Sequence, residues 1–115
     1  MRETKPQLEI GREYRLDSIE GIQIGKKHYL GWDRGKYLGN SSDVDVFIIE
    51  TNLEKIYAFY DNYWIQEHAG IIRHSFSSPE FFPECYPLEE LKRLEQQDNH
   101  FKELLTILKQ LGEQL

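Results

Sequence analysis

The spacing of the apolar residues changes near Ser77, and this change limits the folds that the chain can adopt. Before Ser77, short apolar runs alternate with turn residues, and the run at residues 46–49 is β-branched and aromatic without helical spacing. Such a run is typical of a strand that is covered on both faces or central in its sheet. After Pro87, apolar residues recur every three or four positions, as on an amphipathic helix. The sequence therefore predicts an α+β fold in which a sheet precedes one or two C-terminal amphipathic helices.

Length and composition favour one domain over residues 1–115. A chain of 115 residues with 39% hydrophobic and 30% charged content can bury a single core. Residues 1–7 are polar and are expected to fray. Residues 13–74 are expected to form a mainly antiparallel sheet of about four to six short strands, with an open loop around the glycines and polar residues at positions 31–43. Residues 79–112 are the expected helical region.

The helical region carries its own start, break and stop signals. Ser77, Ser78 and Pro79 suit the first turn of a short helix, which must end before Pro83 because proline lacks an amide donor. A second helical stretch is expected over residues 88–111, with these side chains facing inward: Leu91, Leu94, Phe101, Leu105 and Leu108. The stripe lapses at residues 97–99, where Asp98 or Asn99 would cap a second helix.

The apolar face of this region has two interpretations. Packing on the sheet is the first, and replacing a buried Leu94 or Phe101 with Ala would then cost about 2–5 kcal/mol. The second is a short coiled coil through Leu94, Phe101 and Leu108, which are seven residues apart and would give a homodimer through the C-terminal helix.

Charge is unevenly distributed along the chain. The formal net charge is −6, with eight Lys/Arg and six Asp/Glu in residues 1–36 but six Lys/Arg and fourteen Asp/Glu in residues 43–115. Direct nucleic-acid binding is disfavoured, because its affinity comes from Lys and Arg that neutralise phosphates. The acidic part would instead attract a basic protein partner. The alternative is that the charge only keeps the domain soluble.

Cysteine use and hydropathy indicate a cytoplasmic protein outside the membrane. The lone Cys85 has no partner for an internal disulfide, and Met1 is followed by charged residues rather than by an apolar targeting segment. No apolar run approaches the roughly 20 residues that span a bilayer.

Few residues suggest catalysis. Asp43 and Asp45 are two apart on an expected strand, so their carboxylates would face one side and could bind a divalent cation or divide acid and base roles. A solvated start to a buried strand is the alternative. His68 and His74 lack the spacing of a zinc pair, and Cys85 lies beside an acidic residue rather than in the positive setting of a nucleophile. We therefore expect a non-enzymatic protein without a cofactor or metal.

Aromatic residues suggest an interaction surface. Four Tyr and Trp residues fall between positions 57 and 64, and such residues anchor protein interfaces because they bury a large area at a low cost in rotamer entropy. We expect a loop tip after residue 59 and predict that Tyr60, Tyr63, Trp64 and Glu67 form part of a partner-binding surface. Ordinary packing of these side chains under a loop is the alternative.

Three runs in the middle of the chain occur in a suggestive order. The run VFIIET at residues 46–51 is followed by a turn and by KIYAFYD at residues 55–61, and IRHSF at residues 72–76 leads into SSPEFF at residues 77–82. This order, over residues 44–95, resembles the central pattern of SUKH-type immunity proteins. The resemblance implies an α+β fold and a protein that neutralises a toxin or effector by binding to it.

Two other classes of function stay open from the sequence. An acidic inhibitor from a phage or mobile element could mimic nucleic acid, which would require its carboxylates to form a continuous surface stripe. A small enzyme could use Asp43 and Asp45 or a histidine, which would require a pocket that brings those residues together.

Overall fold

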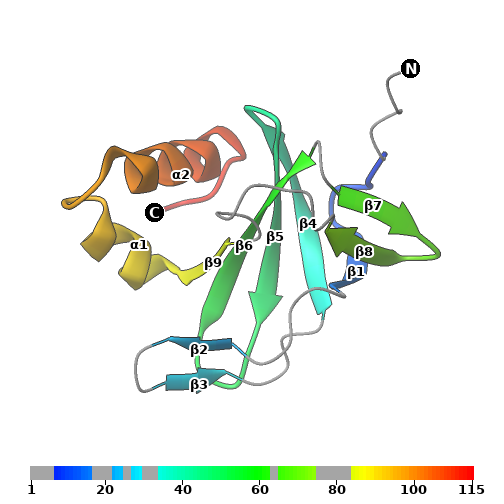
Figure 1. Cartoon of the computed structure of the whole chain (residues 1–115), viewed down its shortest axis with the longest axis horizontal. Coiled ribbons are helices and arrows are strands. Elements are labelled where there is room, and N and C mark those ends of the chain that lie inside the picture. Colours follow the sequence, from blue (N-terminus) through cyan, green and yellow to red (C-terminus); the bar gives the residue numbers. More distant parts are fainter. Residues whose placement is uncertain (1–6, 17–21, 25–26, 30–33, 63–64, 75–83) are drawn as a thin grey trace.

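A computed structural model describes residues 7–16, 22–24, 27–29, 34–62, 65–74 and 84–115. Within these residues, a seven-stranded sheet carries a helical layer, and a separate two-stranded hairpin lies beside it (Figure 1). The elements are β1 (Glu13–Leu16), β2 (Ile22–Ile24), β3 (Lys27–Tyr29), β4 (Arg34–Ser41), β5 (Val44–Glu50), β6 (Lys55–Asp61), β7 (Ile65–His68), β8 (Ile71–His74), β9 (Glu84–Pro87), α1 (Leu88–Leu94) and α2 (Asn99–Gln110).

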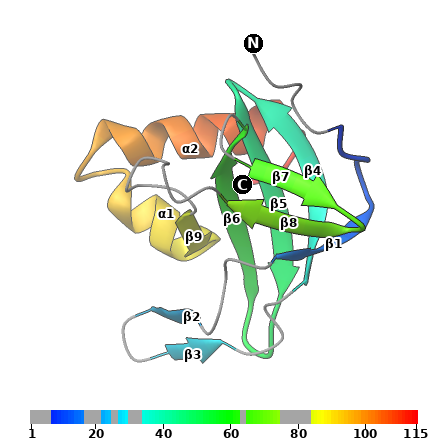
Figure 2. The same cartoon turned by 45° about the vertical axis from the view of Figure 1, so that its right-hand side comes forward.

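The large sheet has the order β7-β8-β1-β4-β5-β6-β9. Its neighbouring strands are antiparallel except for β1 and β8, which are parallel. Figure 2 shows β7 and β8 crossing in front of β4 and β5, so the sheet curls over one of its own faces. The predicted α+β fold with a mainly antiparallel sheet is confirmed, although the sheet has more strands than the sequence suggested.

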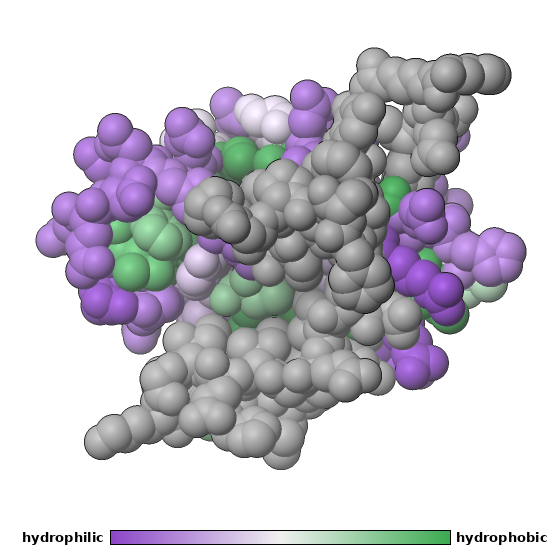
Figure 3. Space-filling model, viewed as in Figure 1, coloured by the Kyte–Doolittle hydropathy of each residue, from purple (hydrophilic) through white to green (hydrophobic). Residues whose placement is uncertain are grey.

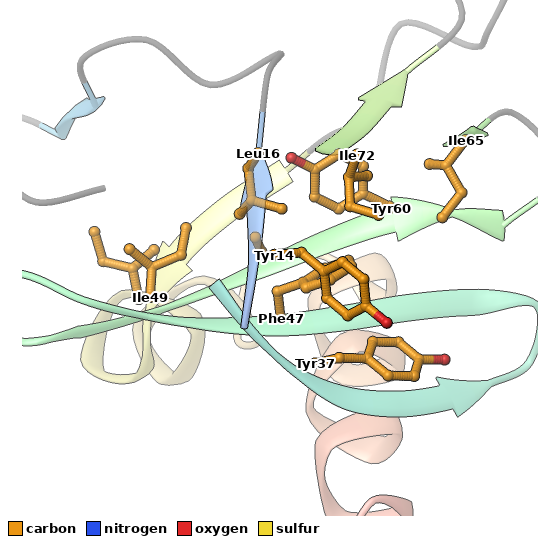
Figure 4. Packing of buried hydrophobic residues seen from close by; sticks show 10 residues of the cluster. Tyr14, Leu16, Tyr37, Phe47, Ile49, Tyr60, Ile65 and Ile72 are labelled. Carbon is orange, nitrogen blue, oxygen red and sulfur yellow. The ribbon is translucent and has the colours of Figure 1, made fainter. Parts of the chain in front are cut away.

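The curled face encloses an aromatic core. Phe47 of β5 is fully buried, and its ring centroid lies 6.0 Å from that of Tyr14, 5.3 Å from that of Tyr37 and 5.4 Å from that of Tyr60 (Figure 4). Aliphatic side chains from β1, β5, β6, β7 and β8 complete this core: Leu16, Ile49, Ile56, Ile65 and Ile72. Each strand of the curl therefore contributes through alternate residues, as the two-residue period of a strand requires.

The opposite face of the sheet is covered by the two helices. Val46, Tyr57 and Phe59 from β5 and β6 pack against α1 and α2. The helical residues in this second core are Leu91, Leu104, Leu105, Ile107 and Leu108. Because Phe47 and Val46 point into different cores and are both fully buried, β5 is covered on both faces, as its sequence predicted.

The helix boundaries agree with the capping signals. The chain breaks between α1 and α2, and the Asp98 side chain accepts a hydrogen bond of 2.9 Å from the His100 amide at the start of α2. At the other end, Gly112 adopts a positive φ of 89°, and the amides of Gly112 and Glu113 donate to Lys109 and Leu108. This is the arrangement in which glycine commonly ends a helix, because it has no Cβ to oppose the left-handed conformation.

The inward face of the helices is partly as expected. Leu91, Leu105 and Leu108 are buried against the sheet, whereas Leu94 and Phe101 are only partly buried. The leucine stripe therefore packs on the sheet, and the expected cost of truncating Leu94 or Phe101 is lower than full burial would give. Neither described helix is long and apolar enough to cross a membrane.

Two predictions about secondary structure are wrong. Residues 84–87, which lie in the expected helical region 79–112 between its two expected helices, form strand β9, in which Cys85 and Tyr86 pair with Ala58 and Tyr57 of β6. An edge strand tolerates a flanking proline that a helix interior does not. Residues 1–6 of the segment 1–7 that is expected to fray, and the short helix expected from Pro79, lie outside the residues that the structure describes.

The second correction concerns residues 34–41, which form strand β4 rather than an open loop. Gly35 is there for close packing, because an added Cβ would come within 2.9 Å of both Leu16 Cδ1 and Phe47 Cβ. A glycine in a strand can thus mark a close approach of side chains instead of a turn.

Candidate functional site

A groove lies between α2 and the turn that joins β4 to β5. It encloses about 590 Å³ and is open to solvent. The residues that line it are Ser42, Val44, His100, Glu103, Leu104, Thr106, Ile107 and Gln110. Apolar side chains and polar side chains are therefore combined in one concave surface, which is the usual composition of a recognition site.

The groove side of α2 overlaps the side that packs on the sheet, because Leu104 and Ile107 belong to the second core and also line the groove. Positions 100, 103, 107 and 110 recur at intervals of three and four residues, and they form a second stripe beside the leucines of the core. Figure 3 shows hydrophilic residues over the outer surface of the helical layer, around a smaller hydrophobic area. This stripe was readable from the sequence, but it was missed because the apolar stripe beside it dominates the helical pattern.

One end of the groove is held by a bond between α2 and β9. His100 Nε2 lies 2.7 Å from Glu84 Oε2, and the Tyr86 hydroxyl donates a 2.7 Å hydrogen bond to Glu84 Oε1. The Glu84 side chain is largely buried, and the Phe101 ring packs edge-on against both Tyr86 and His100. Burial, with the adjacent Glu84 carboxylate, raises the pKa of Tyr86 above its ordinary value. Glu84 and His100 thus connect the start of α2 to the sheet.

The other end of the groove is held by a bond between α2 and β4. The Ser41 hydroxyl donates to Gln110 Oε1, near the end of the helix. Just beyond α2, the Tyr57 hydroxyl donates a 2.9 Å hydrogen bond to Glu113 Oε1. Both ends of α2 are therefore bonded to the sheet, and the bond from Ser41 joins α2 to the strand that leads into the turn.

Asp45 holds the turn from inside the protein. Its side chain is buried and accepts hydrogen bonds from the Tyr37 hydroxyl at 2.6 Å, from Asn40 Nδ2 at 2.9 Å and from Asn62 Nδ2. Burial is the main cause that raises the pKa of Tyr37 above its ordinary range, and the hydrogen bond to Asp45 adds to it. Three donors satisfy the hydrogen-bonding capacity of this buried carboxylate, which therefore holds the surrounding strands together.

The predicted pairing of Asp43 with Asp45 is wrong. Asp43 lies in the turn with a positive φ of 62° and is exposed, whereas Asp45 lies inside β5 and is buried. The turn contains only Ser42 and Asp43, so the strand alternation that would place both carboxylates on one side does not extend to Asp43. These two residues therefore do not form a shared cation or acid–base site.

The turn itself adopts an unfavourable backbone conformation. Ser42 has a φ of 53° and Asp43 has a φ of 62°, and Ser41 pairs with Val44 on either side of them. Two-residue turns of this kind prefer Asn-Gly or Gly-Gly, because side chains with a Cβ resist positive φ. Ser42 thus occupies a position where glycine would be more favourable, and it lines the groove.

The predicted partner-binding residues are only partly placed by the structure. Tyr60 lies inside β6 and is fully buried in the aromatic core, so it is not a surface anchor as the sequence suggested. Glu67 is half-buried and accepts a 2.8 Å hydrogen bond from the Gly70 amide in the turn between β7 and β8. Tyr63 and Trp64 lie outside the described residues, directly after Asn62, whose amide donates to the Asp43 carbonyl at 2.9 Å.

Among the described residues, the other candidates offer neither a metal-binding group nor an activated thiol. Within the described part of the chain, no group of three or more His, Cys, Asp and Glu side chains could hold a metal ion. Burial, with the negative Glu84 beside it, raises the pKa of the Cys85 thiol to about 12. The thiol is therefore protonated at neutral pH, and a protonated thiol is a poor nucleophile.

Alkaline pH should destabilise the fold through its buried phenols. Burial, with the hydrogen bond to Glu113, raises the pKa of Tyr57 to about 12 from 10.0, so folding favours the neutral phenol. The stability that the neutral Tyr57 phenol contributes to the fold is fully present below pH 10 and is lost as the pH rises from 10 to 12. By this linkage, wild type should lose about 2–3 kcal/mol more unfolding free energy than Tyr57→Phe across that window.

Chemical denaturation at several pH values checks this prediction. Tyr37, Tyr86 and Cys85 shift in the same direction as Tyr57 and remain in both proteins, so the difference between the two isolates Tyr57. Parallel curves of stability against pH for the two proteins would contradict the prediction.

Comparison with known proteins adds no relative to these observations. The chain matches no protein-family model, no curated protein and no solved structure. The groove geometry, the buried polar groups and the charge are therefore the basis for a functional proposal.

Proposed function

We propose that this chain is a non-enzymatic protein-binding module that neutralises a toxin or effector by direct binding. The observation that carries this proposal is the groove beside α2, which is lined by the half-buried Val44 and the largely buried Leu104 and Ile107 between polar side chains. Protein interfaces combine buried apolar contacts with a polar rim in this way. The resemblance of residues 44–95 to SUKH-type immunity proteins supports the same class of function.

The charge supports a basic partner. Residues 43–115, which include every groove-lining residue except Ser42, carry fourteen Asp/Glu against six Lys/Arg. A surface of this sign increases the rate at which a positively charged protein meets it. We expect this encounter in the cytoplasm, where a lone reduced Cys85 is compatible with the environment.

The described surface favours this function over the two alternatives. The helical region that follows β9 carries carboxylates interspersed with Lys92, Arg93, Lys102 and Lys109, whereas mimicry of nucleic acid needs an uninterrupted stripe of negative charge. An enzyme that uses Asp43 and Asp45 together loses its support, because Asp45 is buried and Asp43 is in the turn.

Co-purification tests the proposed function directly. The tagged chain should retain a specific protein from native cell lysate, and the affinity of the purified pair should fall as salt rises, because screening weakens attraction between opposite charges. A chain that retains no protein above a tagged control, or that binds its partner equally at low and high salt, would overturn the proposal of a basic partner.

Tyr63, Trp64 and Glu67 remain predicted contributors to that interface. Replacing Tyr63 or Trp64 with Ala should raise the dissociation rate, with a cost of about 2 kcal/mol if either is a hot spot. Glu67→Gln should mainly lower the association rate at low salt. Surface plasmon resonance with the purified partner separates the two rates.

The control for these variants is thermal stability. A change in melting temperature would mean that the variant weakens binding by weakening the fold. If both aromatic variants bind with wild-type affinity and wild-type stability, the interface does not include these two residues.

A further inference from the structure

We infer that the groove beside α2 is the recognition surface itself, and that its occupant is a segment of the partner in which Lys or Arg is flanked by apolar side chains. This inference rests on the proposed function and names the partner chemistry that the groove fits. Three features carry it: the distribution of charge around the groove, the bonds that fix its walls and the conformation of its turn.

The charge around the groove favours a cation. Glu103 is the acidic residue among the described lining residues, and these residues include neither Lys nor Arg. Two further carboxylates lie close by in the chain and sheet: Asp43 follows Ser42 in the turn, and Asp61 is paired in register with Val44. Lys102 and Lys109 are exposed on α2 but do not line the groove. A Lys or Arg side chain can therefore reach the exposed Glu103 while an apolar neighbour contacts Val44 and the small parts of Leu104 and Ile107 that the core leaves accessible.

The groove is held in shape before anything binds. The bond between His100 and Glu84 fixes the start of α2, and the bond between Ser41 and Gln110 fixes its end. Behind the turn, Asp45 joins β4, β5 and the residue after β6 through Tyr37, Asn40 and Asn62. Because little ordering remains to be done on binding, more of the contact energy is available as affinity.

The turn places two polar side chains at positions where glycine would be more favourable. Ser42 and Asp43 both occupy positive φ. Unfavourable backbone conformations concentrate at binding sites, where the surrounding structure maintains them. Here one of the two residues lines the groove, and the other presents a carboxylate beside it.

A random peptide library displayed on phage provides a probe that needs no known partner. Selection on the immobilised full chain should enrich twelve-residue peptides that contain Lys or Arg next to apolar residues. A synthetic peptide of the enriched sequence should then bind the wild type, and Glu103→Lys should weaken that binding by about tenfold or more, because it reverses the charge that the cation meets. Thr106→Arg, which places a bulky cation at the exposed rim, should weaken it similarly.

Glu89→Lys is the matched control, since Glu89 is an exposed carboxylate on α1 outside the groove and the change in net charge is the same. It should change peptide affinity by less than about twofold at moderate salt. If Glu89→Lys and Glu103→Lys lose peptide affinity equally, net charge alone attracts the peptide. That result would overturn the assignment of the groove.

Three other outcomes would also overturn the inference. They are enrichment of acidic or neutral peptides, absence of any enrichment, and self-association of the chain that Thr106→Arg abolishes, which would make a second copy the occupant. If a native partner still co-purifies in any of these cases, the proposed function stands and only the groove assignment fails. If no partner co-purifies, the proposed function itself fails.

Discussion

Replacing Asp45 with Ala should lower the free energy of unfolding by about 3–5 kcal/mol. The carboxylate is buried and accepts hydrogen bonds from Tyr37, Asn40 and Asn62. Its removal leaves the Tyr37 hydroxyl and the Asn62 amide inside the protein without their acceptor, and an unsatisfied buried donor costs its full desolvation penalty. Denaturant titration of the variant measures the loss.

Asp45→Asn separates the hydrogen bonds from the shape of the side chain. The amide keeps the volume and can still accept from Tyr37, but its NH₂ group then meets the NH₂ group of Asn62 unless Asn62 turns its amide around. We expect Asp45→Asn to lower the free energy of unfolding by less than Asp45→Ala does. If the free energy of unfolding of Asp45→Ala lies within about 1 kcal/mol of the wild-type value, the carboxylate does not organise the turn as inferred.

Phe47→Ala should produce a comparable loss, about 3–5 kcal/mol, because it empties the centre of the aromatic core. Phe47 is fully buried, and its ring lies among those of Tyr14, Tyr37 and Tyr60. These partners come from three different strands, so they cannot all move inward to fill the space. The surviving cavity adds to the lost transfer free energy of the ring.

Phe101→Ala is the informative comparison, because it removes the same ring from a partly exposed position on α2. Its cost should fall clearly below that of Phe47→Ala when both are measured by denaturant titration. Equal costs in the two variants would mean that the helical layer contributes as much to the fold as the aromatic core, contrary to the burial of the two rings.

Short-range patterns accounted for much of the fold. The run at residues 46–49 predicted a strand covered on both faces, and the structure buries Phe47 in one core and Val46 in the other. The spacing of Leu91, Leu105 and Leu108 predicted which side of the helices faces the sheet. Such patterns are informative because the periods of strands and helices are set by local backbone geometry.

Local patterns were less reliable at glycine and proline, because each of these residues occurs both in loops and in strands. Gly35 predicted a loop but lies in β4, because Leu16 and Phe47 leave no room for a Cβ there. Pro83 and Pro87 predicted that no helix runs through the residues between them, and the sequence did not indicate that these residues form a strand that pairs with β6. In both cases the secondary structure depends on residues that are distant in sequence, so the local sequence pattern does not reveal it.

The candidate site shows most clearly which properties follow from the sequence and which depend on the tertiary structure. The sequence by itself determined the acidic character of residues 43–115, the amphipathic helix and the position of the cap at Asp98 or Asn99, because composition, period and hydrogen-bonding chemistry are properties of nearby residues. Tertiary structure alone decided that Asp45 is buried while Asp43 is exposed, and that Glu84 meets His100. The physical reason is that burial and pairing of a polar side chain depend on which strands and helices pack around it, and that packing is settled by contacts across the whole chain.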